Sequence, residues 1–375
     1  MGQLLSHPIE DKTLDYKAFQ SLAYCVGSMQ GYRMTMEDAH NVKINEDESL
    51  AVFGVFDGHG GKACADYISD VLPSKIFKNL NSYLKKSHYN NTSALNKDYV
   101  NQVSNGISDL STYMKIIKDS FFEVDHDLPV QNSLNCGSTA IITTIVANKY
   151  IIVANTGDSR SIMSLNGGAA KTLSFDHKPS TMSERVRIEN SGGYVVSGRV
   201  NEILALSRAF GDFKFKFPFI ELSNSINNSN NKYLEANKKY FKDDLVHLPP
   251  ELFQVSVEPD LLVYDLSYLK QPEFIVLACD GIWDCYTNNQ LISLIRKKIS
   301  EDWKLNHITE FILNDCIGMA SSITGIGFDN MTLIIVAIHT NGNIDEWYQI
   351  IKNRVKNEEK LNLNNEISTT NDNRI

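Results

Sequence analysis

The sequence predicts an α+β fold in which two antiparallel β-sheets pack as a central β-sandwich and α-helices flank it. Strand patterns come in runs: residues 138–146 and 150–155 are rich in apolar and β-branched residues around a turn at 147–149. Helical patterns come in pairs, as at 289–300 and 308–319. Hairpins are more frequent than strict strand–helix–strand alternation, so a parallel doubly wound sheet is the weaker alternative.

The N-terminal third begins with residues 1–20, which we interpret as an extended arm ahead of a strand that starts at Ser21. The run Leu50–Phe56 is almost continuously apolar and predicts a buried strand that stops at Asp57. Helical spacing follows, and Pro73 is expected to end or kink that helix because proline lacks the N–H that the helix needs.

Two segments read as insertions. Residues 84–110 are polar and rich in Asn and Ser, which predicts a loop, and helical spacing returns only at 114–124. Residues 222–243 are rich in Asn and Lys and contain too few apolar residues to bury much surface. Residues 182–191 between them predict a helix that a Gly-Gly pair ends.

The C-terminal part resumes regular patterns. Buried strands are predicted at 161–165, 274–279 and 331–338, and the charged, Asn-rich chain from about residue 352 is expected to fray after one helix.

Composition indicates a globular chain with one large domain. The chain has 375 residues, 42% of them hydrophobic, and a net charge of −9, which argues against nucleic acid as the main partner. Its six cysteines form no Cys-x-x-Cys pair, so we expect free thiols in a reducing compartment. No apolar run is long enough to span a bilayer. We therefore expect a cytoplasmic protein, with a nuclear or membrane-associated location as open alternatives.

The first six residues, Met-Gly-Gln-Leu-Leu-Ser, match the myristoylation pattern, with Gly2 as acceptor and Ser6 at the required position. A chance match is the alternative reading. Only Lys12 and Lys17 follow nearby, so an acyl chain on Gly2 would give weak, reversible membrane contact.

Acidic residues stand at the ends of predicted strands. Asp57-Gly58, Asp280-Gly281 and Asp329-Asn330 each lie beside such a run. An isolated ionised carboxylate is costly to desolvate, so several together suggest that a cation compensates them. Oxygen ligands favour a hard ion, Mg²⁺ or Mn²⁺, over zinc.

The two Asp-Gly pairs share one design, in which the glycine lets the backbone carbonyl approach the same ion as the carboxylate. Two such strand ends could hold two ions about 3.5–4 Å apart, as in many phosphatases. Two unrelated hairpin turns are the alternative. Asp284 lies one helical turn after Asp280 and would face the same side, although Asp280 could instead cap the helix.

The remaining candidates come from other motifs. Glu37 and Asp38 are adjacent, so on a strand one would contact metal directly and the other through water. Arg33 is a candidate phosphate clamp, or else a surface ion-pair partner. His59 is the best candidate general acid, with a metal ligand as second choice. Asp329 could supply a last ligand. For Asp158, a turn residue and an additional carboxylate ligand remain equally open.

Nine motifs in this order resemble those of the metal-dependent protein phosphatase 2C (PPM) family, its fungal Ptc branch in particular, and cover most of residues 21–340. They are YRMTMEDAH (32–40), VFDGHGG (55–61), CGSTA (136–140), NTGDSR (155–160), FDHKP (175–179), ALSRAFGDF (205–213), VEPD (257–260), ACDGIWD (278–284) and GFDNMT (327–332).

The resemblance implies a Ser/Thr protein phosphatase in which a water that bridges two metal ions attacks phosphorus. It implies that Asp57, Asp280, the Gly58 carbonyl, Asp329 and Glu37 hold the two ions, with Glu37 and Asp38 acting partly through water. Arg33 would then bind the phosphate and His59 would protonate the leaving oxygen. Asp158 and Asp284 would hold a weaker third ion with Asp280.

The resemblance also implies boundaries: an arm at 1–20, a catalytic domain at 21–345 with insertions near 84–110 and 219–250, and a polar tail at 346–375. The second insertion falls where the family has a flap beside its active site. We expect a monomer that acts on phosphorylated proteins and does not bind nucleic acid. A partner-binding pseudophosphatase and a hydrolase of small phosphomonoesters are the alternatives. No Cys-x5-Arg loop is present, which argues against a cysteine-based phosphatase.

Overall fold

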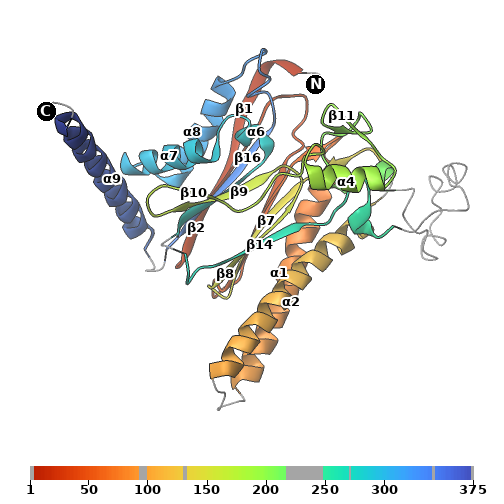
Figure 1. Ribbon diagram of the computed structural model, residues 1–375, viewed down its shortest axis with the longest axis horizontal. Helices are drawn as coiled ribbons and strands as arrows, with labels where there is room; N and C mark the ends of the chain where they lie inside the picture. Colours follow the sequence, from red (N-terminus) through yellow and green to blue (C-terminus); the bar gives the residue numbers. More distant parts are fainter. Residues whose placement is uncertain are drawn as a thin grey trace, which may run out of the picture.

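The computed structural model describes residues 4–92, 99–129, 133–216, 248–269, 272–339 and 343–372. Two antiparallel sheets form its centre (Figure 1). The six-stranded sheet has the order β1 (Leu4–Ala18), β2 (Leu22–Arg33), β16 (Met331–Ile338), β15 (Pro272–Ala278), β9 (Arg160–Leu165) and β10 (Ala170–Thr172). The five-stranded sheet has the order β14 (Asp260–Asp265), β8 (Tyr150–Thr156), β7 (Ala140–Val146), β4 (Leu50–Phe56) and β3 (Ala39–Ile44).

Helices cover the outer face of each sheet. α1 (Ala63–Thr92) and α2 (Tyr99–Asp127) pack on the five-stranded sheet, and α7 (Asn288–Ser300), α8 (Leu305–Gly318) and α9 (Ile344–Asp372) pack on the six-stranded one. The predicted α+β sandwich is therefore confirmed. No helix of the described residues is both long and apolar enough to span a bilayer.

Smaller elements complete the described chain. They are α4 (Met182–Asn190), the short α6 (Asp280–Trp283), the 3₁₀ turns η1 (Phe213–Phe215) and η5 (Pro250–Leu252), and the paired short strands β5 (Gly58–His59), β6 (Gly137–Ser138), β13 (Phe210–Gly211), β11 (Val195–Val196) and β12 (Arg199–Val200).

The central strands are apolar on both faces because each face meets a different layer. In β4, Phe53 and Val55 point into the core between the two sheets, whereas Val52 and Phe56 point toward α1 and α2. Side chains alternate across a strand, so a continuous apolar run is what such a two-sided position requires. This explains why Leu50–Phe56 could be predicted within a residue of its observed bounds.

The predicted loop at 84–110 is wrong. α1 continues to Thr92 and α2 begins at Tyr99, and the two helices lie side by side as a hairpin that projects from the sandwich (Figure 1). Tyr83 anchors the pair, because its hydroxyl donates to Asp109 at 2.7 Å and its ring meets the edge of Tyr113. A helix that packs on only one neighbour needs few apolar residues, so its sequence resembles a loop. Pro73 does not end α1.

Regular structure extends further toward both ends of the described residues than expected. Within the predicted arm, Leu4–Ala18 form the edge strand β1, which pairs antiparallel with β2, although most of its residues are polar. The tail that was expected to fray from about residue 352, after one helix, is itself helical: α9 runs from Ile344 to Asp372 and buries Trp347, Ile351 and Val355 against the six-stranded sheet and α7. Of the predicted flap insertion, residues 219–247 lie outside the described residues. The domain boundaries themselves stay a prediction.

Candidate functional site

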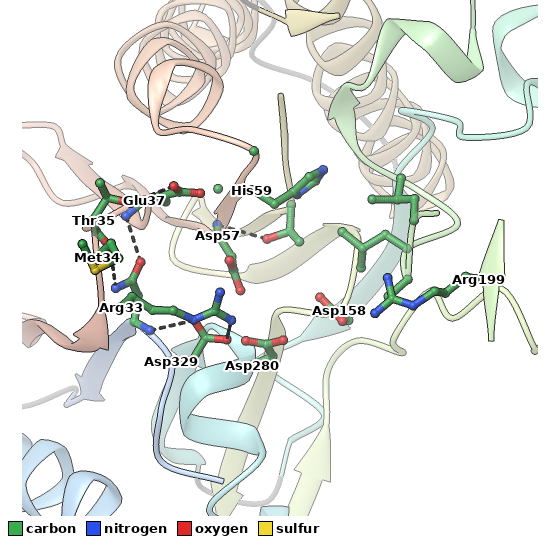
Figure 2. A pocket seen from close by; sticks show the side chains of 17 residues that line it. Arg33, Met34, Thr35, Glu37, Asp57, His59, Asp158, Arg199, Asp280 and Asp329 are labelled. Carbon is green, nitrogen blue, oxygen red and sulfur yellow. Dashed lines mark hydrogen bonds and ion pairs between the residues drawn. The ribbon is translucent and has the colours of Figure 1, made fainter. Parts of the chain in front are cut away.

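One end of the sandwich holds a cavity of about 450 Å³, and most of the predicted site residues line it. Figure 2 shows its acidic floor and the arginines at its two sides. The predicted residues that line it are Arg33, Glu37, Asp57, Gly58, His59, Asp158, Asp280 and Asp329. Asp38 lies buried behind the floor, and Asp284 lies in a small adjoining cavity with Arg33 and Asp329.

The two sheets contribute one aspartate each. Asp57 follows the last residue of β4 in the five-stranded sheet, and Asp280 follows β15 of the six-stranded sheet by two residues. Asp57 is fixed through its backbone, because its N–H donates to the Thr139 hydroxyl at 3.1 Å and its carbonyl accepts from the Thr139 N–H at 2.9 Å. The side-by-side strand ends that the Asp-Gly motifs suggested are therefore present.

Asp280 begins a helix but does not cap it. It is the first residue of α6, and the N-cap position belongs to Cys279. Gly281 comes next because a side chain there would collide with the backbone carbonyl of Asn330. The glycine of this motif thus allows α6 and the Asp329-Asn330 turn to meet.

Carboxylate oxygens of Asp57, Asp158 and Asp280 all lie within 4.8 Å of one another. In a second group, a carboxylate oxygen of Asp57, one of Asp38 and the sulfur of Cys279 also lie within 4.8 Å of one another. Burial, and after it the charge of neighbouring carboxylates, raises the pKa of Asp57 and of Asp280 well above the usual range. Asp158, which sequence chemistry could not assign, therefore belongs to the acidic cluster.

Asp38 is buried and carries an oxygen, Oδ2, without a hydrogen-bond partner among the described residues. Burial raises the pKa of its carboxyl to about 7. It does not lie on a strand with Glu37 as the sequence suggested, because both residues stand in the turn between β2 and β3. Glu37 instead accepts from the Thr35 hydroxyl at 2.8 Å and the Gly61 N–H at 3.2 Å.

The cluster fits divalent cations. Its donors are oxygens, and the neighbouring Cys279 has a pKa raised well above the usual range by burial, so it stands there as a neutral thiol and not as a zinc-binding thiolate. Side-chain cations among the described contacts are few: Lys178 pairs with Asp158, and Arg33 donates from Nη2 to Asp329 Oδ2 at 2.5 Å. The excess of desolvated negative charge, with an unpartnered oxygen on Asp38, is what a bound metal would relieve.

Arg33 and His59 occupy different sides of the cavity. Burial lowers the pKa of Arg33, but the charges of Asp329, Asp280 and Asp57 outweigh it and raise the pKa overall. The ring of His59 points away from Asp57 and Asp280 (Figure 2) and meets Asp212, with Nε2 at 2.5 Å from Oδ2. Burial lowers the pKa of His59, and the Asp212 carboxylate outweighs that effect and raises it. His59 is not part of either metal-sized group.

Sequence reasoning missed three residues that shape the cavity. Asn330 holds the Arg33–Glu37 turn, because its Oδ1 accepts from the Glu37 N–H at 2.9 Å and its Nδ2 donates to the Thr35 carbonyl at 3.0 Å. Lys178 and Asp212 are the other two. All three lie inside motifs that were visible in the sequence, but nothing in their spacing indicated which carboxylate or carbonyl each would meet.

The family model and the curated relatives that match this chain carry the same family name. Residues 22–324 match the family model described as Protein phosphatase 2C. Protein phosphatase 2C homolog 4 of Saccharomyces cerevisiae is 37% identical, over 96% of this chain and 100% of the relative. Protein phosphatase 2C homolog 2 of Schizosaccharomyces pombe is 35% identical, over 96% of this chain and 84% of the relative.

Solved structures agree on the fold. A serine-threonine phosphatase 2C from Toxoplasma gondii superposes with a TM-score of 0.63 and 18% identity, over 88% of this chain and 99% of that one. A phosphatase from a pathogenic strain of the same organism superposes with a TM-score of 0.61 and 21% identity, over 88% of this chain and 96% of that one.

Proposed function

The chain belongs to the protein phosphatase 2C family, and from this premise we propose that it removes phosphate from phosphoserine and phosphothreonine in proteins at the acidic cavity. The observation that carries the proposal is the group of Asp57, Asp158 and Asp280, whose oxygens lie within 4.8 Å of one another at the cavity floor. So much desolvated negative charge suits a site that holds Mg²⁺ or Mn²⁺.

We assign Asp57 and Asp280 to a pair of ions, with the Gly58 carbonyl, Asp329, Glu37 and Asp38 completing their surroundings directly or through water. Asp158 and Asp284 are the candidates for a weaker third ion. When bound, such ions lower the pKa of a coordinated water and neutralise charge on phosphoryl oxygens. Gly58 suits its place because a side chain there would collide with the Glu37 carbonyl.

The protein's own groups then bind and orient the substrate. Arg33 presents a guanidinium at the cavity wall, where it suits a phosphate dianion: Nη2 donates to Asp329, and the guanidinium has further N–H donors for a ligand. His59 lines the cavity with its ring directed away from the carboxylate floor. In-line displacement places the leaving oxygen opposite the attacking water, so an acid should stand away from that floor.

In this reaction a water oxygen bonds to phosphorus while the bond from phosphorus to the Ser or Thr oxygen breaks. The leaving oxygen takes its proton from His59, and a proton of the attacking water, carried through solvent, restores the imidazolium. The products are the free hydroxyl and inorganic phosphate. A pseudophosphatase is disfavoured because every carboxylate of the cavity floor is present.

The decisive experiment measures hydrolysis of a phosphothreonine peptide by the purified protein with and without Mn²⁺. We expect activity only with the ion, and a loss of about 10²-fold or more in Asp57→Asn and Asp280→Asn. Asp119→Asn, an exposed carboxylate of α2 paired with Lys115, is the matched control and should keep full activity. Full activity in either cavity variant contradicts the proposal, and faster turnover of small phosphomonoesters than of peptide would favour the alternative substrate class.

Location and modification are further proposals. The protein acts as a cytoplasmic monomer, and an acyl chain on Gly2 gives it weak membrane contact. The intact mass of the chain co-expressed with an N-myristoyltransferase tests the acylation of Gly2, and an unmodified mass rejects that acylation.

A further inference from the structure

His59 contacts the carboxylate of Asp212, which is not part of the acidic cluster. The Nε2 atom of His59 lies 2.5 Å from Oδ2 of Asp212, whose side chain is only 2% exposed, whereas that of His59 is 27% exposed at the cavity. Because a carboxylate only accepts hydrogen bonds, Nε2–H is the donor. The imidazole therefore has Nδ1 as its only nitrogen left for a substrate.

The space around this pair is built from backbone that tolerates no side chain. A side chain at Gly137 would overlap both Asp212 Oδ2 and His59 Nε2, and one at Gly211 would overlap the Cys136 carbonyl. Asp212 itself adopts a left-handed backbone with φ of 49°, which is uncommon outside glycine. A chance contact would not require two such glycines and an aspartate in this conformation.

Helix α2 holds the segment that carries Asp212. The buried carboxylate of Asp125 accepts from the Gly211 N–H at 2.8 Å and from Lys216 Nζ at 2.8 and 3.0 Å. Lys216 is itself fully buried and also donates to the Ala209 carbonyl at 2.9 Å. The residues on both sides of Asp212 are thus tied to the same helix, which fixes the direction from which Asp212 approaches His59.

We propose that Asp212 is a positioning residue that holds His59 through Nε2 so that Nδ1 delivers the proton to the Ser or Thr leaving oxygen. The inference rests on the proposed role of His59 as general acid. Asp212 touches neither substrate nor metal in this arrangement and acts through the ring alone. It orients the imidazole through a charge-assisted hydrogen bond, which a neutral amide in its place would form more weakly.

The test uses two substrates that differ in their need for an acid. A phosphothreonine peptide releases an alkoxide and needs the proton, whereas p-nitrophenyl phosphate releases a stable phenolate and does not. Asp212→Asn keeps the shape and an acceptor oxygen but removes the charge. We expect its kcat on the peptide to fall about 10-fold or more, with KM unchanged, and kcat on p-nitrophenyl phosphate to stay within about twofold.

Two further variants separate positioning from general damage. His59→Gln should show the same selective loss, and the double variant should be no slower on the peptide than His59→Gln alone, because both residues act through one group. Glu273→Gln is the matched control, since Glu273 is an equally buried, paired carboxylate in the six-stranded sheet. Glu273→Gln should lower the stability of the protein and leave the ratio of kcat on the peptide to kcat on p-nitrophenyl phosphate unchanged.

Ring ¹⁵N shifts of His59 give a readout that does not depend on activity. In the wild-type protein they should show Nε2 protonated and hydrogen-bonded, and in Asp212→Asn they should change. Unchanged shifts, or equal loss on both substrates, overturn the inference. If His59→Gln also lowers kcat equally on both substrates, the proposed acid role of His59 fails instead. A wild-type protein that is inactive on both substrates rejects the proposed function. The ring shifts of His59 would then still decide whether Asp212 holds the ring.

Discussion

At the residue scale, the cavity depends on close backbone contacts that only particular side chains permit. Gly281 lets α6 meet Asn330, and Gly58 lets β5 pass the Glu37 carbonyl. The sequence showed both glycines beside aspartates and suggested that their carbonyls approach a metal ion, which stays a prediction. It could not show that each approaches protein backbone, because that neighbour comes from a distant part of the chain.

Glu184 offers a residue-scale prediction away from the cavity. This buried carboxylate of α4 pairs with Arg187 and Arg208, each at 2.8 Å, and despite its burial these arginines lower its pKa to about 2. A lowered folded-state pKa stabilises the protein above the unfolded pKa, near 4.5, and that stabilisation is lost as pH falls toward 2.

We therefore expect Glu184→Gln to have a lower free energy of unfolding than the wild type. The gap between the two free energies should be largest above pH 5 and roughly halved by pH 3. Urea unfolding at a series of pH values measures it. Glu189→Gln, an exposed carboxylate of the same helix, is the control and should give a small gap. A gap that widens toward pH 3 would contradict the assignment.

At the element scale, strands buried on both faces could be predicted, and elements that lie on one layer only could not. β4 and β16 were visible as apolar runs because each meets two layers. The strand β1, the segments of α1 and α2 that lie farthest from the sheet, and helix α9 are rich in polar residues, so their sequences resemble loops or tails. Each packs against another element, as β1 does against β2, and the pattern of one segment alone does not reveal that partner.

The docking of α9 gives the element-scale prediction. Trp347 is buried, donates from its indole N–H to the Glu273 carbonyl at 2.8 Å, and packs edge-on against Phe274. Trp347→Ala should therefore cost about 3–5 kcal/mol in the free energy of unfolding. Denaturant titration checks this, and Ile350→Ala on the exposed side of the same helix should cost much less. Equal costs would mean that α9 does not contribute to the core.

At the scale of the whole molecule, the acidic cluster joins the two sheets. Asp57 comes from one sheet and Asp280 from the other, and burial together with the charges of nearby carboxylates raises the pKa of both. The motifs singled out both residues, and the structure brings them together, but the motifs could not give their distances or the contacts of Asp212, Lys178 and Asn330. Those depend on how the sheets stack.

Metal removal should therefore lower the stability of the wild type and leave that of Asp57→Asn almost unchanged. With Mn²⁺ at 100 times its dissociation constant, the wild type should gain about 2.7 kcal/mol over the metal-free form. Asp57→Asn should gain little, yet in the metal-free state it should be more stable than the metal-free wild type, because one repelling carboxylate is gone. Thermal melts with and without chelator measure both differences. A metal-free Asp57→Asn protein that melts below the metal-free wild type would contradict this account.

The pairing of β1 has a practical consequence for anyone who handles the protein. Leu4 stands opposite Arg33 in the ladder and lines the small cavity shared with Asp284 and Asp329. The start of the described chain is thus a neighbour of the catalytic machinery. An affinity tag fused ahead of this strand lies beside the groups under assay, whereas one placed after α9 (Figure 1) follows a helix that lines no part of either cavity. Kinetic comparisons of variants are best made on protein purified through its C-terminus.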